Sequence, residues 1–344
     1  MLRDPARNVF ENALFRKTLD HPHMQDTPLS TTLSSVNTNH QRTLPSSTKA
    51  KNMRGSRPCL SIGLPVYNGA NFLGQAVESI LAQTYEDFAL VISDNASTDN
   101  TEEICRAYAE KDERVHYRRN QENVGAVRNY NRLFEACESE YFKWAAHDDL
   151  LAPEYLARCM EVLERRPSVT VCHTQTIYID GSGATCGDFD DQLDLRAPRP
   201  HERYRDYLFR PYPRCNAIFG VIRTSVLHQT PLFGRYLSSD RVLLGELALR
   251  GEIYRIPQPL FLRRDHSQQA WKANPTREML RAWFDPKLKG KIAFPSWRLL
   301  LEHSRSVMRA PMDWRERLHC FRLLGAWVRQ NDGDLVRDLF LARR

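Results

Sequence analysis

Short apolar runs alternate with segments of helical periodicity between residues 58 and 150. The runs at 59–66, 88–92 and 115–118, and a fourth that begins at Tyr141, have the length and composition of buried strands. Between them, apolar residues recur at helical spacing over 72–81, 98–112 and 125–134. Four alternations of strand and helix within about ninety residues predict an α/β protein with a doubly wound, mostly parallel sheet and flanking helices.

The alternation continues less regularly towards residue 275. It predicts a helix over 153–165, strands over 169–179 and 217–222, and an apolar helix that follows Asp240. Residues 180–214 are rich in Gly, Asp, Pro and Arg without periodicity, which is typical of a functional loop or lid. The run 253–262 is predicted to be an edge strand, since Pro257 and Pro259 would interrupt a central one.

Both ends of the chain differ from this centre. Residues 1–57 are polar and basic with little apolar periodicity, which predicts a disordered or weakly ordered extension. Residues 276–344 are expected to form a basic helical tail, so the predicted domain spans 58–275, in two halves that meet at about residue 150. An apolar stripe in the tail is more typical of core packing than of a membrane anchor. The stripe consists of Trp314, Leu318, Phe321, Leu324 and Val328.

The net charge of +7 is unevenly distributed. Residues 1–57 hold 9 basic and 4 acidic residues (+5), and residues 276–344 hold 15 and 8 (+7). Residues 58–275 hold 25 basic and 30 acidic residues (−5), and an acidic centre argues against a nucleic-acid-binding domain. It fits a metal-using enzyme whose basic ends contact anionic lipid, or whose basic ends are simply solvated.

The eight cysteines are scattered, with no C-x-x-C and no Cys/His spacing typical of zinc ligands. This pattern argues against a zinc site and a disulfide framework, and it favours a reducing cytoplasm. No segment approaches the roughly 18 consecutive apolar residues of a membrane span, and the N-terminus lacks a signal-peptide pattern. The protein is therefore expected to be cytoplasmic, either soluble or peripheral at the inner face of the plasma membrane.

The segment from Tyr141 to Asp149 carries the most informative chemistry. A predicted buried strand ends on two adjacent carboxylates, Asp148 and Asp149. The carboxyl ends of parallel strands meet where open α/β sheets bind ligands, and two acids there repel each other unless a cation or ligand compensates them. The pair therefore suggests a divalent metal and a phosphate-bearing substrate. The alternative is that Asp149 caps the helix that starts near Pro153.

Two common phosphate-binding motifs do not occur in the sequence. No G-x-G-x-x-G follows the first strand, which disfavours a dinucleotide-binding Rossmann domain. No G-x-x-x-x-G-K-[ST] is present either, so a P-loop does not hold the phosphate.

Five short motifs, in order between residues 58 and 150, resemble those of family-2 glycosyltransferases with the GT-A fold. None of them is specific alone, and the resemblance rests on their order and spacing. It continues more weakly towards residue 270, and residues 1–57 and 276–344 lie outside it. The motifs are Ser61-Ile-Gly-Leu-Pro-Val-Tyr-Asn68, Ser79-Ile-Leu-Ala-Gln-Thr-Tyr85, Ser93-Asp-Asn-Ala-Ser-Thr-Asp99, Asn123-Val-Gly125 and His147-Asp-Asp149.

The resemblance implies a binding site for a sugar nucleotide. Asp94 would accept a hydrogen bond from the base, which favours uracil N3–H, although guanine also offers donors. Pro65 and Tyr67 would flank the base, Arg128 would contact base or phosphate, and Asp148 would meet the ribose. Without the family, Asp94 could form an Asx turn or a helix cap, and Arg128 could be a solvated arginine on a helix face.

The resemblance also implies a metal site. Asp149 would ligate Mg²⁺ or Mn²⁺ that bridges the two donor phosphates and acts as a Lewis acid. The family's D-x-D is here His-Asp-Asp, so only the last acid falls at the metal-binding position, and His147 is not assigned as a ligand. His266 lies where some relatives place a further metal or phosphate contact. Without the family, His266 is interpreted as a surface histidine.

An inverting transfer needs a general base, because the pKa of an acceptor hydroxyl lies far above neutral. The resemblance places Asp240 at the family's catalytic acid position. Glu246, further along the same predicted helix, is the second candidate. Without the family, Asp240 could be a helix N-cap, alone or with Ser238 or Ser239.

The resemblance thus implies a metal-dependent, inverting transferase that moves a sugar from a nucleotide donor, with a UDP-sugar favoured, to a saccharide or glycolipid hydroxyl. Residues 58–150 would bind the nucleotide, and residues 151–275 would hold the acceptor and the base. Such chains often serve polysaccharide or glycolipid assembly at the cytoplasmic membrane face. Two alternatives stay open: a non-catalytic binding or scaffold module, and a nucleotidyltransferase, although its Gly-rich, Arg-bearing loop does not follow the first strand. The sequence does not name the sugar, the acceptor or the linkage.

Overall fold

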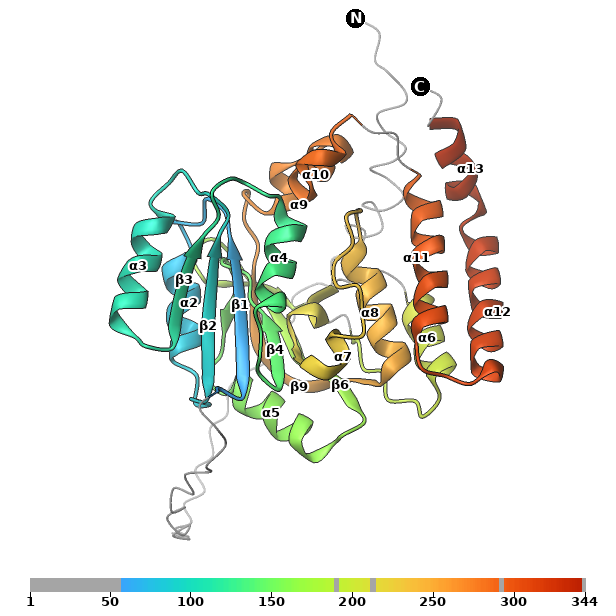
Figure 1. Cartoon of the computed structure of the whole chain (residues 1–344), viewed down its shortest axis with the longest axis horizontal. Helices are drawn as coiled ribbons and strands as arrows, with labels where there is room; N and C mark the ends of the chain where they lie inside the picture. Colours follow the sequence, from blue (N-terminus) through green and yellow to red (C-terminus); the bar gives the residue numbers. More distant parts are fainter. Residues whose placement is uncertain (1–56, 189–191, 211–214, 291–293, 342–344) are drawn as a thin grey trace, which may run out of the picture. The chain divides into compact units, whose positions relative to one another are not determined.

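One mixed, mostly parallel sheet organises the computed structural model, which describes residues 57–188, 192–210, 215–290 and 294–341 (Figure 1). Its strands are β1 (Leu60–Val66), β2 (Phe88–Asp94), β3 (Val115–Arg119), β4 (Tyr141–Trp144), β5 (Leu150–Leu151), β6 (Val169–Ile179), β7 (Thr185–Asp188), β8 (Val221–Arg223) and β9 (Glu252–Arg264). The strand order is β3-β2-β1-β4-β8-β6-β9-β5, with β7 paired to β6. Strands β3, β2, β1 and β4 run parallel, β8 is antiparallel to both neighbours, and β9 is parallel to β6. The predicted α/β class is confirmed.

Helices cover both faces of this sheet. They are α2 (Leu73–Leu81), α3 (Thr101–Lys111), α4 (Ala126–Glu135), α5 (Tyr155–Arg165), α6 (Pro200–Leu208), α7 (Thr224–Leu227), α8 (Ser239–Arg250), α9 (Ala270–Ala273), α10 (Arg277–Phe284), α11 (Pro295–Arg309), α12 (Trp314–Gln330) and α13 (Asp332–Leu341), with short 3-10 helices η3 (Cys215–Phe219) and η4 (Pro286–Leu288). One buried core joins α2, α3 and α5 to the sheet, and a second joins α4 and α8. Successive side chains of a strand point to opposite faces, so β4 sends Tyr141 to the first core and Phe142 and Trp144 to the second.

The strand and helix pattern predicted for residues 58–150 is confirmed, but the start of α3 differs. The predicted start at residue 98 was wrong, because the helix begins at Thr101. The Asp99 carboxylate accepts hydrogen bonds from the backbone N (3.1 Å) and the hydroxyl (2.5 Å) of Thr101. Ser97 and Thr98 instead bind the loop that follows β1, through Asn68.

Strand β9 is not the edge strand that its prolines predicted. It lies between β6 and β5 in the sheet. Its pairing with β6 jumps from Ile256, opposite Thr174, to Pro259, opposite Gln175, so the chain bulges at residues 257–258. Residues 257–259 are exposed. Strand β5 pairs with β9 only at Phe261 and Leu262, so β5 does not reach either proline, and the bulge removes a ladder position at Pro257. An inner strand therefore tolerates both prolines.

The segment 180–214 is more ordered than its composition predicted. It contains β7, which pairs with β6, and α6, whereas residues 189–191 and 211–214 lie outside the described residues. The sequence pattern did not predict α6, because the buried face of this helix includes an arginine. The buried Arg203 donates hydrogen bonds to the carbonyls of Ala248 (2.7 Å) and Leu249 (3.4 Å) at the end of α8. The strand predicted over 217–222 was also wrong in extent, since η3 precedes the three-residue β8.

The C-terminal helices pack onto the rest of the structure. A third buried core joins α6 and α8 to α11 and α12, and it consists of Tyr204, Leu249, Val307, Ala310, Cys320 and Leu324. Within the predicted apolar stripe, only Leu324 is buried, at 3% exposed. Trp314, Leu318 and Phe321 are 67%, 43% and 37% exposed, so core packing was a wrong prediction for these three residues.

The predicted N-terminal extension, residues 1–57, lies outside the described residues except for Arg57. Among the helices of the described ranges, none has both the length and the apolar composition that crossing a membrane requires.

Candidate functional site

The carboxyl ends of β1, β2 and β4 lie at one edge of the sheet, because these strands run parallel. Val66 at the end of β1 pairs with Asp94 at the end of β2, and Gly63 pairs with Trp144 at the end of β4. The predicted donor-binding residues Pro65, Tyr67 and Asp94 are therefore neighbours at this edge. Pro65 is buried within β1, whereas Tyr67 is 40% exposed where the following loop begins.

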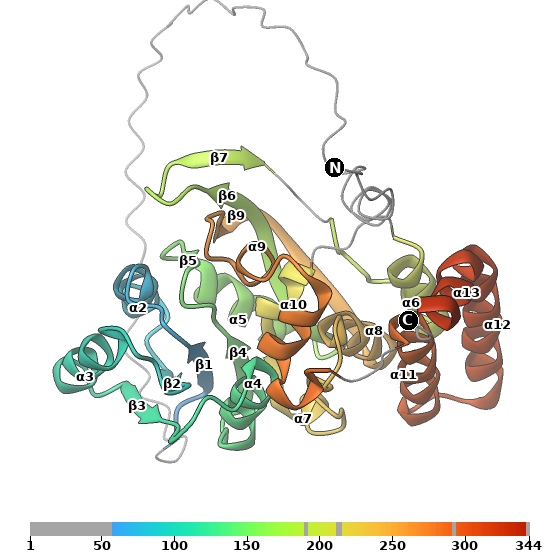
Figure 2. The same cartoon turned by 90° about the horizontal axis from the view of Figure 1, so that it is seen from above.

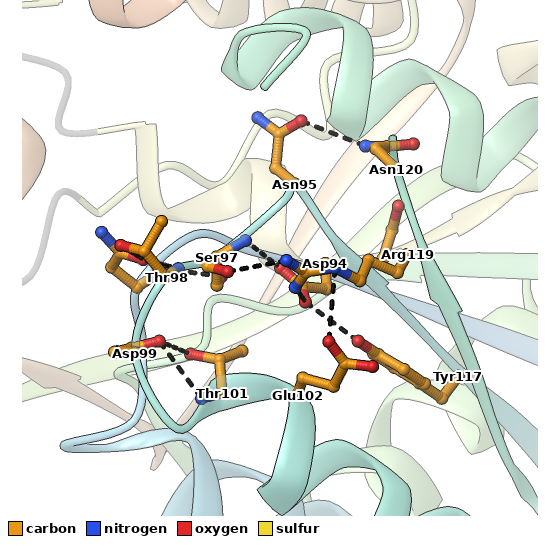
Figure 3. Close-up of polar contacts among 12 residues, drawn as sticks. Asp94, Asn95, Ser97, Thr98, Asp99, Thr101, Glu102, Tyr117, Arg119 and Asn120 are labelled. Atoms are coloured by element: carbon orange, nitrogen blue, oxygen red, sulfur yellow. Dashed lines mark hydrogen bonds and ion pairs between the residues drawn. The ribbon is translucent and has the colours of Figure 1, made fainter. Parts of the chain in front are cut away.

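The loop after β1 is tied to the segment after β2 by main-chain hydrogen bonds to the side chains of Ser97, Asp99 and Thr101, which Figure 3 labels. The backbone N of Asn68 donates to the Ser97 hydroxyl, and that of Gly69 donates to the Thr101 hydroxyl, both at 2.9 Å. The backbone N of Ala70 donates to Asp99 Oδ2 at 3.1 Å. These bonds hold the loop after β1 and the segment after β2 together in the absence of a ligand.

Asp94 is completely buried, and both of its carboxylate oxygens accept hydrogen bonds (Figure 3). Its Oδ1 accepts from the backbone N of Ser97 at 2.8 Å. This bond is that of an Asx turn, the interpretation of Asp94 that does not depend on the family. Its Oδ2 accepts from the Tyr117 hydroxyl at 2.9 Å and from Arg119 Nη1 at 2.5 Å. Burial and this hydrogen bond raise the pKa of Tyr117, so the phenol stays protonated and donates. Because Asp94 Oδ2 already accepts two hydrogen bonds, a base that binds this oxygen would replace Tyr117 or Arg119.

Asp94→Asn is expected to lower the free energy of unfolding by about 2 kcal/mol, because a charged hydrogen bond to Arg119 is lost in a buried place. Arg119 also pairs with Glu102, from Nε to Oε2 at 3.3 Å, but the Glu102 side chain is 37% exposed. Glu102→Gln is therefore the matched control, with an expected loss below about 1 kcal/mol. Urea unfolding of both variants measures the difference, and equal losses would contradict the assignment.

The predicted residues Asp148, Asp149 and His266 are brought together at the end of β9. Asp149 Oδ1 accepts a hydrogen bond from the backbone N of Arg264 at 2.9 Å. The His266 ring, through Nε2, lies 2.9 Å from Asp148 Oδ2. Leu150 of β5 pairs with Leu262 of β9, and this pairing sets the contact between the two segments. The N-cap position of α5 is Glu154, so Asp149 is not the cap of that helix.

Arg264, which the sequence analysis did not single out, holds this cluster in place. Its side chain is completely buried, and Nε donates to the main-chain oxygen of Asp148 at 2.9 Å. Nη1 donates to the main-chain oxygens of Asp180 (3.1 Å) and Gly181 (3.2 Å), and Nη2 donates to Gln75 Oε1 at 2.7 Å. One side chain thus binds the acid pair to α2 and to the turn between β6 and β7.

The two acids of the pair have different electrostatic surroundings. Burial and the charge of Asp148 raise the pKa of Asp149 to about 7. Burial acts in the same direction on Asp148, but His147 and the hydrogen bond from His266 lower the pKa of Asp148 below its ordinary value. Asp149 is therefore an anion that its surroundings stabilise poorly, and a cation beside it would relieve the repulsion.

The geometry admits a metal held partly by a substrate. Among the residues with described side chains, no group of three or more His, Cys, Asp or Glu could enclose an ion by itself. His266 Nδ1 is buried and has no hydrogen-bond partner among the described residues. One of the two ring nitrogens of His266 can therefore still accept or donate a bond.

Asp240 lies half-buried in the first turn of α8, where Asp240 Oδ1 accepts from the backbone N of Arg241 at 2.9 Å. Asp240 is not the N-cap, because Ser238 occupies that position with a left-handed φ of 64° and makes no side-chain cap bond. Asn131 joins α4 to the loop before α8 through two hydrogen bonds with the backbone of Phe233, at 2.9 and 3.1 Å. Helix α4 is therefore fixed to the loop that leads into α8.

Tyr130 of α4 lies in the electrostatic field of Asp240 and of the acid pair. Trp144 at the end of β4 donates to the main-chain oxygen of Tyr130 at 3.1 Å. Burial, followed by the charges of Asp148, Asp149 and Asp240, raises the pKa of Tyr130, while Arg263 opposes the shift. The charges of three acids from two separate segments therefore act on this phenol.

Arg128 is exposed on the first turn of α4. Gly125 just before this helix has a φ of 84°, and a Cβ there would lie 2.7 Å from Pro286 Cδ and 2.9 Å from the main-chain oxygen of Phe284. Glycine at this position thus lets the start of α4 contact the chain that follows α10. The Arg128 side chain is exposed to solvent on the same turn of α4.

Glu246, the second candidate for the base, was a wrong prediction. Its side chain is 1% exposed, and its oxygens accept from Ser306 (2.8 Å), Arg309 (2.6 Å) and Arg250 (2.9 Å). These bonds join α8 to α11. A carboxylate engaged on both oxygens by cations and closed to solvent does not meet an acceptor hydroxyl.

Glu246→Gln is expected to lower the free energy of unfolding by about 3 kcal/mol, because Arg250 and Arg309 lose their buried anion. Turnover per folded molecule is expected to stay unchanged. The matched control is Glu161→Gln, whose 41%-exposed carboxylate pairs with Arg165 on α5 and is expected to contribute less than about 1 kcal/mol. Thermal unfolding and turnover of both variants test the assignment, and a large loss of turnover in Glu246→Gln would restore Glu246 as a candidate base.

Comparisons with known proteins agree on one family. Residues 61–230 match the family model described as glycosyl transferase family 2. An uncharacterized glycosyltransferase of Rickettsia felis is 36% identical over 110 residues, which make up 31% of this chain and 18% of that protein. The glycosyltransferase GlyG of Streptococcus pneumoniae is 27% identical over 124 residues, or 36% of this chain and 41% of GlyG. The matched part therefore spans less than half of either relative.

Solved structures show the same fold. The crystal structure of S. aureus TarS 1–349 in complex with UDP-GlcNAc has a TM-score of 0.58 and 14% sequence identity, covering 79% of this chain and 72% of that chain. At this level of identity, the likeness is one of fold.

Proposed function

Since residues 61–230 place this chain in glycosyltransferase family 2, we propose that it transfers a sugar from a nucleotide-sugar donor to a hydroxyl group of a saccharide or glycolipid, with inversion. The observation that carries this proposal is that Asp94, at the end of β2, and Asp148 and Asp149, which follow β4, stand at the carboxyl ends of two strands that both pair in parallel with β1. Open α/β sheets bind nucleotides at this edge. The UDP-GlcNAc complex of TarS makes a UDP-sugar the first donor to test.

In this proposal the nucleotide binds along the fixed loops after β1 and β2. Tyr67, exposed at the rim, flanks the base together with the backbone around Pro65. Asp94 accepts from uracil N3–H after releasing Tyr117 or Arg119. Arg128 contacts the base or a phosphate.

Asp148 and His266 are expected to change partners together when the donor binds. A ribose hydroxyl that donates to Asp148 would replace the present hydrogen bond from His266, whose ring Nε2 lies 2.9 Å from Asp148 Oδ2. The ring of His266 is then available beside Asp149. The exchange exposes no unsatisfied polar group, because each group leaves one partner for another.

Asp149 and His266 are the residues that would hold Mg²⁺ or Mn²⁺ beside the donor phosphates. The raised pKa of Asp149 and the unpaired Nδ1 of His266 are both compatible with a cation bound between these two residues. Magnesium is usually bound by one or two carboxylates together with substrate phosphates and waters, which matches a site without a complete protein cage. When bound, the ion supplies Lewis-acid stabilisation of the diphosphate leaving group.

Asp240 is the proposed general base. Its carboxylate accepts the proton of the acceptor hydroxyl while the hydroxyl oxygen attacks the anomeric carbon opposite the diphosphate, and a single displacement of this kind inverts the configuration. Tyr130 keeps its proton near neutral pH, because burial and the surrounding acids raise its pKa.

A donor panel tests the proposed function. Purified protein with Mn²⁺ is expected to show a higher melting temperature with a UDP-sugar and to release UDP slowly, because a ligand that binds only the folded state stabilises it. GDP-sugars and samples with EDTA are the controls. Equal stabilisation by every donor, with or without metal, would contradict the proposal. Metal-dependent binding without any turnover would favour a non-catalytic module, and formation of a new nucleotide sugar would favour a nucleotidyltransferase.

A further inference from the structure

Helix α12 turns an apolar stripe outward. Trp314, Leu318 and Phe321 are 67%, 43% and 37% exposed. At about 100° per residue, they lie within about 60° of one another around the helix axis. The buried Cys320 and Leu324 lie on the side of the helix that joins the third core. Figure 1 shows α12 beside α11, at the periphery of the C-terminal helices.

Positive charge borders this stripe. Arg315, Arg322 and Arg329 are all exposed, and their positions follow the stripe around the helix on one side. The Arg315 guanidinium lies 5.4 Å from the centre of the Trp314 ring. The acid of this helix, Glu316, is turned inward, where its Oε2 lies 2.6 Å from His201 Nδ1. The exposed side of α12 is therefore apolar and cationic. We call the surface formed by these three apolar residues and three arginines the α12 face.

We propose that the α12 face binds the surface of an anionic lipid bilayer, with the apolar side chains among the headgroups and the arginines on lipid phosphates. A helix that lies in a membrane interface has this combination of aromatic, leucine and arginine residues. Residues 276–344 carry 15 basic and 8 acidic residues, so the surrounding charge also attracts an anionic membrane.

Charge disfavours two other occupants of the α12 face. A second copy of the chain, docked through the same face, would bring two sets of arginines together. Residues 1–57, with 9 basic and 4 acidic residues, would also meet like charge. The inference extends the proposed function, since a glycolipid acceptor resides in a bilayer. Lipid binding is nevertheless measurable without donor or acceptor.

The test is sedimentation of the full chain with vesicles of phosphatidylcholine alone or mixed with phosphatidylglycerol. We expect binding to the mixed vesicles, weaker binding in high salt, and at least a tenfold loss of affinity in Trp314→Ser/Phe321→Ser. Trp314→Phe/Phe321→Trp keeps the aromatic surface and is expected to bind like the natural chain.

The role of the arginines is tested separately. The triple variant Arg315→Gln/Arg322→Gln/Arg329→Gln is expected to lose about a hundredfold in affinity for the mixed vesicles. The matched control removes the same charge from exposed arginines of α3 and α5, as Arg106→Gln/Arg158→Gln/Arg165→Gln, and is expected to lose less than about threefold.

Three results would overturn the inference: no binding of the natural chain to phosphatidylglycerol vesicles, an equal loss in the control triple variant, or a dimer that becomes monomeric in Trp314→Ser/Phe321→Ser. Stabilisation by Mn²⁺ and donor is expected to be the same in all of these variants. A chain that binds vesicles but no donor would contradict the proposed function while leaving this inference in place.

Discussion

Replacing Asp149 by Asn is expected to abolish metal-dependent donor binding and, at the same time, to stabilise the metal-free protein above pH 7. Binding is lost because an amide has no charge with which to hold a divalent cation. Stability rises because the carboxylate is 8% exposed and lies beside Asp148. Asn keeps the acceptor for the backbone N of Arg264, which lies 2.9 Å from Asp149 Oδ1.

The sign of the stability change follows from proton linkage. Burial and Asp148 raise the pKa of Asp149 to about 7 in the folded protein, whereas an unfolded aspartate titrates near about 4. Between these values the folded state binds more protons than the unfolded state, so stability falls as the pH rises from about 4 to about 7. The variant lacks this loss and is expected to be more stable on the order of 3 kcal/mol at pH 8.

Urea unfolding in EDTA at pH 5 and pH 8 measures this effect. The difference in stability between the two proteins is expected to be about three times smaller at pH 5 than at pH 8. Asp265→Asn, which changes an exposed acid at the same end of β9, is the control and should alter stability by no more than about 0.5 kcal/mol at either pH. An Asp149→Asn protein that is less stable at pH 8, or that still binds the donor through metal, would contradict the account.

Asp240→Asn is expected to lower turnover by about 10² to 10⁴ without weakening donor binding. The amide matches the carboxylate in size but cannot accept the proton of the attacking hydroxyl. The metal that would hold the donor phosphates is assigned to Asp149 and His266. The affinity for the donor should therefore not change in Asp240→Asn. Single-turnover UDP release measures the chemical step, and the shift in melting temperature with donor measures binding.

Glu246→Gln is the comparison for Asp240→Asn, because both changes replace an acid by its amide on helix α8. The expected results are opposite: Asp240→Asn loses turnover and keeps its stability, whereas Glu246→Gln loses stability and keeps turnover. Retained turnover in Asp240→Asn would remove this residue as the base.

The nucleotide-binding half of the fold was predictable because local and global signals agree there. Strands buried between two helical layers are mostly apolar, and β1, β2 and β4 fit this pattern, with Asp94 and Lys143 as their charged exceptions. The parallel pairing of Val66 with Asp94 then follows from the alternation of strand and helix. The position of β9 was not predictable from its prolines. They lie at or beside a bulge at residues 257–258, outside the short part of β9 that pairs with β5.

The site was predictable only where its residues stand at the ends of elements. Asp94, Asp149 and Asp240 stand at or after the end of a strand or in the first turn of a helix, and the resemblance to the family gave each of them a role. Arg264 and His266 bind the acid pair from 115 or more residues away, a contact that no local pattern contains. Periodicity also cannot tell whether a polar residue of a helix faces solvent or another helix, as the buried Glu246 shows.

The most direct test of the central claim is the anomalous scattering of manganese in crystals grown with UDP and Mn²⁺. The account predicts one strong peak between the Asp149 carboxylate and the diphosphate, with the His266 ring close enough to bind the ion. A diphosphate bound elsewhere on the protein, or a peak remote from Asp149 while UDP occupies the edge of the sheet, would contradict it.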